Sequence, residues 1–302
     1  MFNFEREQKT FSIKGIKIGG QPGERATVLI GTIFYPKQLK ELGKEERKKV
    51  ENLILKQIEM EELTKKIGLV DVFIGGEDDV RRNIDFFINI SDRPFLIDSP
   101  DPKVIETAVN YVNEIGIIDR VICNSINIGT VERCEKLEGL KSAILLLYNP
   151  KDLTTEGRLS LLENGGGIIN KGLIEIATEI GIENILLDPA ITPFEHSVGE
   201  ALRSLVVLKA KYCYPVGCSI HNLVASWLWL KRYEDKKKIF DICSIGSNAI
   251  PQLLGSDFIL YGPIEKADKI FPYSAMVDII LSEASDYFGI KSQKEHPRWS
   301  LR

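Results

Sequence analysis

The chain has 302 residues, of which 44% are hydrophobic, and a formal net charge of −4. This length suits one large α/β domain or two small ones, and the acidic balance argues against nucleic acid as the main partner, because nucleic-acid-binding surfaces are basic. No apolar run is long enough to cross a bilayer, and the N-terminal MFNFEREQKTF lacks the apolar core of a signal peptide, so we expect a cytoplasmic protein without direct membrane insertion.

Eight apolar, strand-like segments alternate with amphipathic helical segments along the chain. Their continuous apolar character predicts parallel strands that are buried on both faces. The segments are residues 27–35, 69–76, 94–99, 120–127, 142–149, 184–191, 215–222 and 257–264. Eight β–α units in succession favour a closed (β/α)8 TIM barrel over a doubly wound sheet, and we expect one domain over residues 1–302. Residues 1–20 predict a short hairpin that plugs the barrel bottom or decorates its rim.

Two connections between these segments are long. One runs from Pro36 to about Glu46, and the other, NPKDLTTEGRLSLLENGGGIINKG, carries three consecutive glycines, Gly165 to Gly167. Long loops at the carboxyl end of a barrel are usually functional. The glycines fit a flexible surface turn and a substrate lid equally well.

Polar side chains recur where the predicted strands end. They are Asp71 and Glu77, Asp98, Asn124 and Asn127, Asn149, Asp188, and Ser219 with His221 and Asn222. The carboxyl ends of barrel strands converge on one cavity, so these side chains are candidates for a site. Capping of the next helix explains Asp98 or Asp188 alone about as well. It does not explain six strands that end in this way.

The predicted cavity is rich in carboxylates and amides but poor in Lys and Arg. This disfavours a sugar phosphate, which needs a cationic cradle or a helix N-terminus. It favours a neutral, flat heterocycle, because a carboxylate accepts two parallel hydrogen bonds from an amino-pyrimidine edge.

No metal site is expected. The three histidines, His196, His221 and His296, have no ligand spacing. The five cysteines, Cys123, Cys134, Cys213, Cys218 and Cys243, form no CxxC pair and suit reduced thiols. A Ser/His/Asp triad stays open, although the sequence has no GxSxG elbow.

Several motifs in chain order resemble the family of the H subunit of tetrahydromethanopterin S-methyltransferase. They are IGGQPGE (18–24), TVLIGTIFY, PFLIDS, the NSIN block, VGCSIHN and GSDFILYGPIE (255–265). That family is similar to the wider group of pterin-binding barrels, which includes methyltetrahydrofolate:corrinoid methyltransferases and dihydropteroate synthase. The similarity extends over nearly the whole chain.

The resemblance implies a reaction and a set of site residues. The reaction is methyl transfer between N5 of tetrahydromethanopterin or tetrahydrofolate and the cobalt of a corrinoid that a partner protein carries. Asp98, Asn124 and Asp188 match the pterin-binding positions, Asp71 matches less closely, and Ser219 lies beside them. Asn222 matches a strand-7 asparagine near N5, and with Asp188 it is expected to take part in catalysis. The resemblance also implies a homodimer and other subunits of a membrane methyltransferase complex as partners.

Two alternatives to a methyltransferase remain. A dihydropteroate synthase-like enzyme would need a strand-7 Lys and a strand-8 Arg to hold a pyrophosphate, and PVGCSIHN and DFILYGPI offer neither. A non-catalytic pterin-binding or assembly subunit that kept the barrel is not excluded by any residue, although the complete set of strand-end polar residues disfavours it.

Overall fold

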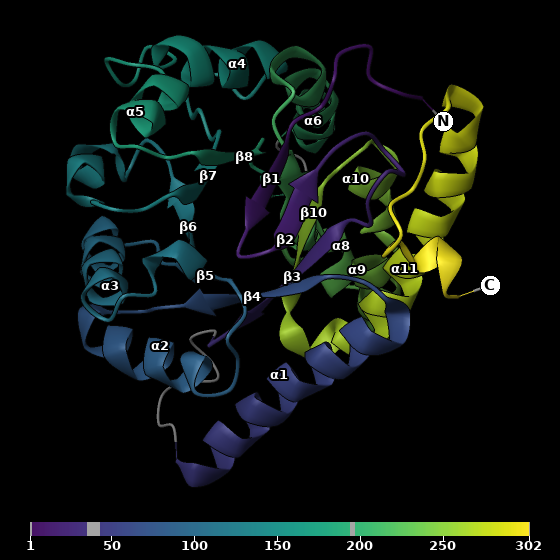
Figure 1. Cartoon of the computed structure of the whole chain (residues 1–302), viewed down its shortest axis with the longest axis horizontal. Coiled ribbons are helices and arrows are strands. Elements are labelled where there is room, and N and C mark those ends of the chain that lie inside the picture. Colours follow the sequence, from purple (N-terminus) through teal and green to yellow (C-terminus); the bar gives the residue numbers. More distant parts are fainter. Residues whose placement is uncertain (1, 35–42, 194–196, 302) are drawn as a thin grey trace.

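The computed structural model describes residues 2–34, 43–193 and 197–301. Most of the described chain is a barrel of parallel strands surrounded by helices (Figure 1). The barrel strands are β3 (Val28–Ile33), β4 (Gly68–Phe73), β5 (Phe95–Asp98), β6 (Val121–Ile126), β7 (Ser142–Leu146), β8 (Asn184–Asp188), β9 (Gly217–Cys218) and β10 (Phe258–Pro263). The predicted (β/α)8 architecture is confirmed.

The strands pair in the order β8-β7-β6-β5-β4-β3-β10-β9. Between the two ends of this order, β8 and the segment before β9 meet at one bridge, Leu187 to Val216. The Leu187 amide donates to the carbonyl of Pro215 at 2.9 Å. This seam closes the barrel with one bridge, whereas the other neighbouring strands pair at two to five positions.

Helices follow the strands and cover the outside of the barrel. They are α1 (Lys44–Thr64), α2 (Val80–Ile88), α3 (Pro102–Glu114), α4 (Thr155–Asn164), α5 (Leu173–Glu179), α6 (Val198–Tyr212), α7 (His221–Ser226), α8 (Leu228–Lys231), α9 (Lys236–Gly246), α10 (Ala249–Leu253) and α11 (Ala267–Ser285). Helix α3 shows why these segments are helical: Pro102 occupies its first turn, and the Asp101 carboxylate accepts a hydrogen bond from the Lys103 amide at 2.9 Å. None of the described helices is long and apolar enough to span a membrane.

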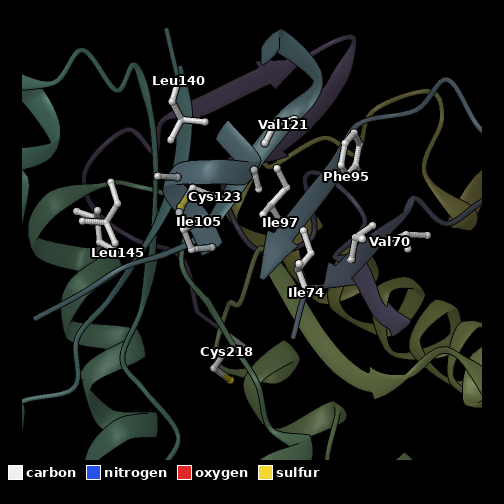
Figure 2. Packing of buried hydrophobic residues seen from close by; sticks show 14 of the residues in the cluster. Val70, Ile74, Phe95, Ile97, Ile105, Val121, Cys123, Leu140, Leu145 and Cys218 are labelled. Carbon is white, nitrogen blue, oxygen red and sulfur yellow. The ribbon is translucent and has the colours of Figure 1, made fainter. Parts of the chain in front are cut away.

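The main hydrophobic core lies between the strands and the helices. Every second strand residue faces outward into it, such as Val70 on β4, Phe95 and Ile97 on β5, and Val121 and Cys123 on β6 (Figure 2). The side chains between them face the barrel interior. Strands that are buried on both faces account for the continuous apolar character of their sequences.

A hairpin closes the amino end of the barrel. Its strands β1 (Thr10–Ile13) and β2 (Ile16–Gly19) are antiparallel and cross the ring of strands in Figure 1. Ile13 and Ile18 of the hairpin pack on the lower inward-facing residues of the barrel, among them Leu69 and Leu96. The segment 1–20 therefore plugs the amino end of the barrel, as predicted, and a binding site is expected at the carboxyl end.

Candidate functional site

Four polar side chains occupy inward-facing positions toward the carboxyl ends of their strands. On each strand an apolar residue of the lower interior comes two positions earlier, where side chains share a face. The pairs are Leu69 and Asp71 on β4, Leu96 and Asp98 on β5, Ile122 and Asn124 on β6, and Leu186 and Asp188 on β8. The structure thus brings these four predicted residues to one end of the barrel interior.

Asp71 is the centre of a hydrogen-bonded group. Its carboxylate accepts from the Thr32 hydroxyl at 2.9 Å and from the Asn124 amide at 3.2 Å. The side chain is buried, and burial raises the pKa of Asp71 to about 6 against the two hydrogen bonds. A proton can therefore move on or off this carboxyl near neutral pH.

Asp98 lies on β5 between the strands of Asp71 and Asn124, paired in register with Phe73 and Asn124. Burial and the neighbouring Asp71 charge raise its pKa well above the ordinary value. Because two close carboxylates disfavour each other's ionisation, the pair retains a proton more readily than an isolated carboxyl does. The group can consequently both donate and accept hydrogen bonds.

A cavity of about 480 Å³ opens beside Asp188. Ser219 and Asn222 line it together with Asp188, so three of the predicted positions share one space. Its other lining residues are Leu146, Tyr148, Leu153, Ala190, Ile191, Thr192 and Pro193. No Lys or Arg is among the described lining residues, and the volume is within the usual range for small-molecule sites.

The Asp188 carboxylate is held by the turn that follows it. It accepts from the Ala190 amide at 2.7 Å, and Ala190 has a left-handed backbone with a φ of 61°. Burial raises the pKa of Asp188 to about 7, against the Ala190 hydrogen bond and the nearby Arg158 charge. At neutral pH this carboxyl is thus divided between its two forms.

The predicted seventh strand is wrong over its second half. Residues 215–222 were expected to be extended, but β9 ends at Cys218 and α7 begins at His221. The strand ends after two residues because the chain turns at Ser219 into the helix. The backbone N–H of Asn222 donates to the Ser219 carbonyl at 3.1 Å in this turn. Asn222 still reaches the cavity, from the first turn of α7.

Some strand-end residues serve local structure and lie outside the cavity. Glu77 pairs with Lys103 on the surface. Asn127 accepts from the Gly129 amide, and Asn149 accepts from the amides of Lys151 and Asp152. Turn formation explains these positions.

The three glycines form the turn that ends α4. Gly165 caps the helix with a left-handed backbone, and the Gly167 carbonyl accepts from the Lys151 ammonium group. None of them lines the described part of the cavity; the expected turn is present, and the substrate lid stays a prediction. Of the other long connection, residues 35–42 lie outside the described residues.

The histidines take no part in a metal cluster within the described residues, where no group of three or more His, Cys, Asp or Glu gathers. His221 packs its ring against Gly262, and His296 lies near the C-terminus. His196 lies outside the described residues. The five cysteines are free.

Two residues of the site were not predicted. Thr32 occupies an inward position of β3, and its polarity in an otherwise apolar strand is a signal that could have revealed it. Arg158 on α4 is fully buried beside Asp188, and its sequence context resembles an ordinary helix surface.

Another cavity, of about 330 Å³, lies at the amino end of the barrel. Its lining includes Lys17, Arg25, Lys65 and His296. None of the predicted site residues faces it, so the candidate site is the carboxyl-end group described above.

The chain matches one protein family over residues 6–293, described as tetrahydromethanopterin S-methyltransferase MtrH subunit. The chain belongs to this family. It is 41% identical to the H subunit of tetrahydromethanopterin S-methyltransferase from Methanothermobacter thermautotrophicus, over all of both chains. It is 43% identical to the H subunit of a putative methyltransferase, mtx, from Methanosarcina barkeri, over 98% of each chain. As a member of the MtrH family, the chain is a methyltransferase subunit.

Solved structures show the same fold at low sequence identity. A dihydropteroate synthase from Clostridium difficile has a TM-score of 0.58 and 15% identity, covering 85% of this chain and 97% of that one. The dihydropteroate synthase of Xanthomonas albilineans has a TM-score of 0.56 and 14% identity, covering 90% of this chain and 98% of that one. At these identities the similarity shows only that this chain has the same barrel fold.

Proposed function

We propose that this chain binds a methyl-tetrahydropterin at the carboxyl end of its barrel and transfers the N5 methyl group to a corrinoid carried by a partner protein. The family, whose description names tetrahydromethanopterin, favours that pterin over tetrahydrofolate. The single observation that carries the proposal is the buried Asp188 carboxyl, which shares a cavity with Ser219 and Asn222.

The donor and acceptor groups of the site suit a pterin. An amino-pyrimidine edge presents N–H donors, for which Asp188 offers carboxylate oxygens. The Asp71, Asp98 and Asn124 group adds further acceptors and an amide donor. Leu146, Ile191 and Pro193 give the cavity apolar walls for a flat ring.

The chemistry requires the C–N5 bond to break. The methyl group leaves without the bonding electron pair, which stays on N5, and the cobalt(I) centre of the acceptor supplies the pair for the new bond. Since an amine anion is a poor leaving group, a proton or hydrogen bond at N5 lowers the barrier. Asn222 is our candidate for this hydrogen bond because it lines the same cavity as Asp188 and carries a side-chain amide.

A methyl-transfer assay tests this function. Purified protein is incubated with methyl-tetrahydromethanopterin or methyl-tetrahydrofolate, each with free cob(I)alamin, and cobalt methylation is followed by absorbance. We expect transfer from methyl-tetrahydromethanopterin and a large loss with the Asp188→Ala variant. Tight pterin binding with no transfer to any corrinoid would instead support a non-catalytic subunit.

We also propose the setting in which the subunit acts. The relatives are named as subunits of methyltransferases, which supports further subunits as partners, and the proposed reaction adds a corrinoid-binding protein. We propose a cytoplasmic homodimer at the periphery of such a complex. Light scattering of the purified chain measures the dimer, and a monomeric mass at assay concentration would contradict it.

A further inference from the structure

Arg158 is a fully buried cation whose hydrogen bonds all go to backbone carbonyls. Its Nε donates to the carbonyl of Pro189, and Nη2 donates to that of Ala190 at 3.4 Å. Its Nη1 donates to the carbonyl of Leu153 and to that of Thr154, the latter at 3.2 Å. A buried guanidinium is costly unless paired, so this arrangement calls for an explanation.

The carbonyls belong to two loops on different sides of the cavity. Leu153 and Thr154 end the loop after β7, and Pro189 and Ala190 form the turn after β8. Leu153 and Ala190 themselves line the cavity. Arg158 therefore joins two walls of the candidate pterin site without lining it.

Arg158 binds the same turn that orients the Asp188 carboxylate. The Ala190 amide donates to the Asp188 carboxylate, while the Ala190 carbonyl accepts from Arg158. Ala190 has a left-handed backbone, which a residue with a Cβ adopts only at some cost. The two hydrogen bonds on either side of this residue fix the conformation.

Charge gives Arg158 a second effect on Asp188. Burial favours the neutral carboxyl, whereas the guanidinium lowers the pKa of Asp188. The Cys218 thiol also faces this carboxyl, with its own pKa raised by burial, so it stays neutral. The charges of Glu200 and Asp152 also act on Arg158 and favour its ionised form.

We propose that Arg158 is a positioning residue of the pterin site, which fixes the direction of the Asp188 carboxylate and favours its ionised form. The inference rests on the proposed function, since it assumes that the ionised Asp188 accepts hydrogen bonds from the pterin. It adds a residue that contacts no substrate and acts through the carboxylate and the two loops.

Two variants separate the geometric effect from the charge effect. Arg158→Lys keeps the charge but loses most of the four hydrogen bonds, and Arg158→Met loses both. The control is Lys209→Met, which removes another buried cation, paired with Asp257 before β10 at the opposite end of the barrel. Calorimetry measures the affinity for tetrahydromethanopterin from pH 6 to 9, and thermal unfolding measures stability.

For Arg158→Met we expect a loss of affinity of about tenfold or more at pH 7, which shrinks as the pH rises and Asp188 ionises. For Arg158→Lys we expect a loss that is similar at every pH. Lys209→Met should lose stability and keep both affinity and pH profile. A folded Arg158→Met protein with the wild-type affinity and pH profile would overturn the proposal.

A ligand-free measurement keeps this test separate from the proposed function. NMR titration of the Asp188 carboxyl carbon in wild type and Arg158→Lys, and in Arg158→Met if it folds, reports the charge effect without any pterin. We expect the wild-type Asp188 pKa in Arg158→Lys and a higher one in Arg158→Met, and a wild-type value in folded Arg158→Met would overturn the charge effect. If wild-type protein binds no pterin, the proposed function fails while this titration still decides what Arg158 does.

Discussion

The amide of Asn124 on β6 reaches past β5 and donates to the carboxylate of Asp71 on β4 at 3.2 Å. The bond joins two strands that are not neighbours in the sheet, and Asp98 on the strand between them is the third member of the group. Side chains of β3, β4 and β6 are thus hydrogen bonded through Asp71, and Asp98 on β5 interacts with Asp71 by charge; together they form one polar unit.

Replacing Asn124 tests this unit. Asn124→Ala leaves Asp71 with the Thr32 hydroxyl alone, and we expect the pterin affinity to fall about tenfold because a buried partner is lost. Calorimetric titration measures the change. The matched control is Asn127→Ala from the same NSIN block, whose side chain serves a local turn. Equal affinities in the two variants would show that Asn124 is outside the site.

Asp188→Ala should weaken pterin binding by roughly 1–3 kcal/mol, since the donors of the amino-pyrimidine edge would be buried without partners. Titration calorimetry on folded variant protein gives the value directly. Unchanged affinity would remove Asp188 from the pterin site.

The raised pKa of Asp188 predicts a pH-dependent stability. In the unfolded chain the carboxyl loses its proton near 3.8, and in the folded chain near 7. Between these values the folded state binds more protons, so this group's contribution to the free energy of unfolding falls as the pH rises from about 4 to about 7. Asp188→Asn has no such proton.

We therefore expect wild type to lose stability relative to Asp188→Asn across this interval, with a constant difference above and below it. Urea unfolding of both proteins from pH 3.5 to 8.5 measures the difference. Comparing the two proteins cancels other titrating groups, such as His221 and His296, whose pKa values are lowered by burial to about 4. A difference that does not vary with pH would mean that Asp188 titrates normally.

Asn222→Ala should slow methyl transfer while leaving the pterin affinity within a few-fold, because a hydrogen bond made mainly in the transition state affects kcat. Capping of α7 would be the structural alternative, but the N-cap of this helix is Ile220, without a side-chain cap. Single-turnover rate and melting temperature are measured on the same preparation. A destabilised variant with a normal single-turnover rate would show that the catalytic assignment is wrong.

The strands could be predicted because burial on both faces leaves a simple apolar pattern. Seven of the eight predicted segments contain a strand at nearly the expected place. The segment 215–222 misled because Val216, Cys218 and Ile220 are buried whether the chain is extended or turning, and apolar pattern alone does not separate these cases.

Candidate site residues divided in a similar way. Asp71, Asp98, Asn124 and Asp188 follow from the strand period, since each is two residues beyond an inward apolar residue. Glu77, Asn127 and Asn149 share the strand-end address, yet they lie in the loops, where the period no longer applies. Arg158 could not be predicted because its link to Asp188 depends on the carbonyls of Pro189 and Ala190, far along the chain, which leave no sequence signature.

The single bridge at the seam of the barrel means that a ligand bound there would help to hold two strand edges together. Leu187 and Val216 make the only bridge between β8 and the β9 segment in the described structure, and Asp188 and Ser219 lie just beyond it on either side of the cavity. A molecule that binds both residues would stand where further rungs are missing and would tie the two edges together. We expect this part of the barrel to open locally more often than the rest. A bound ligand would oppose that opening, and its release would leave the carboxyl end of the cavity more open to the next molecule.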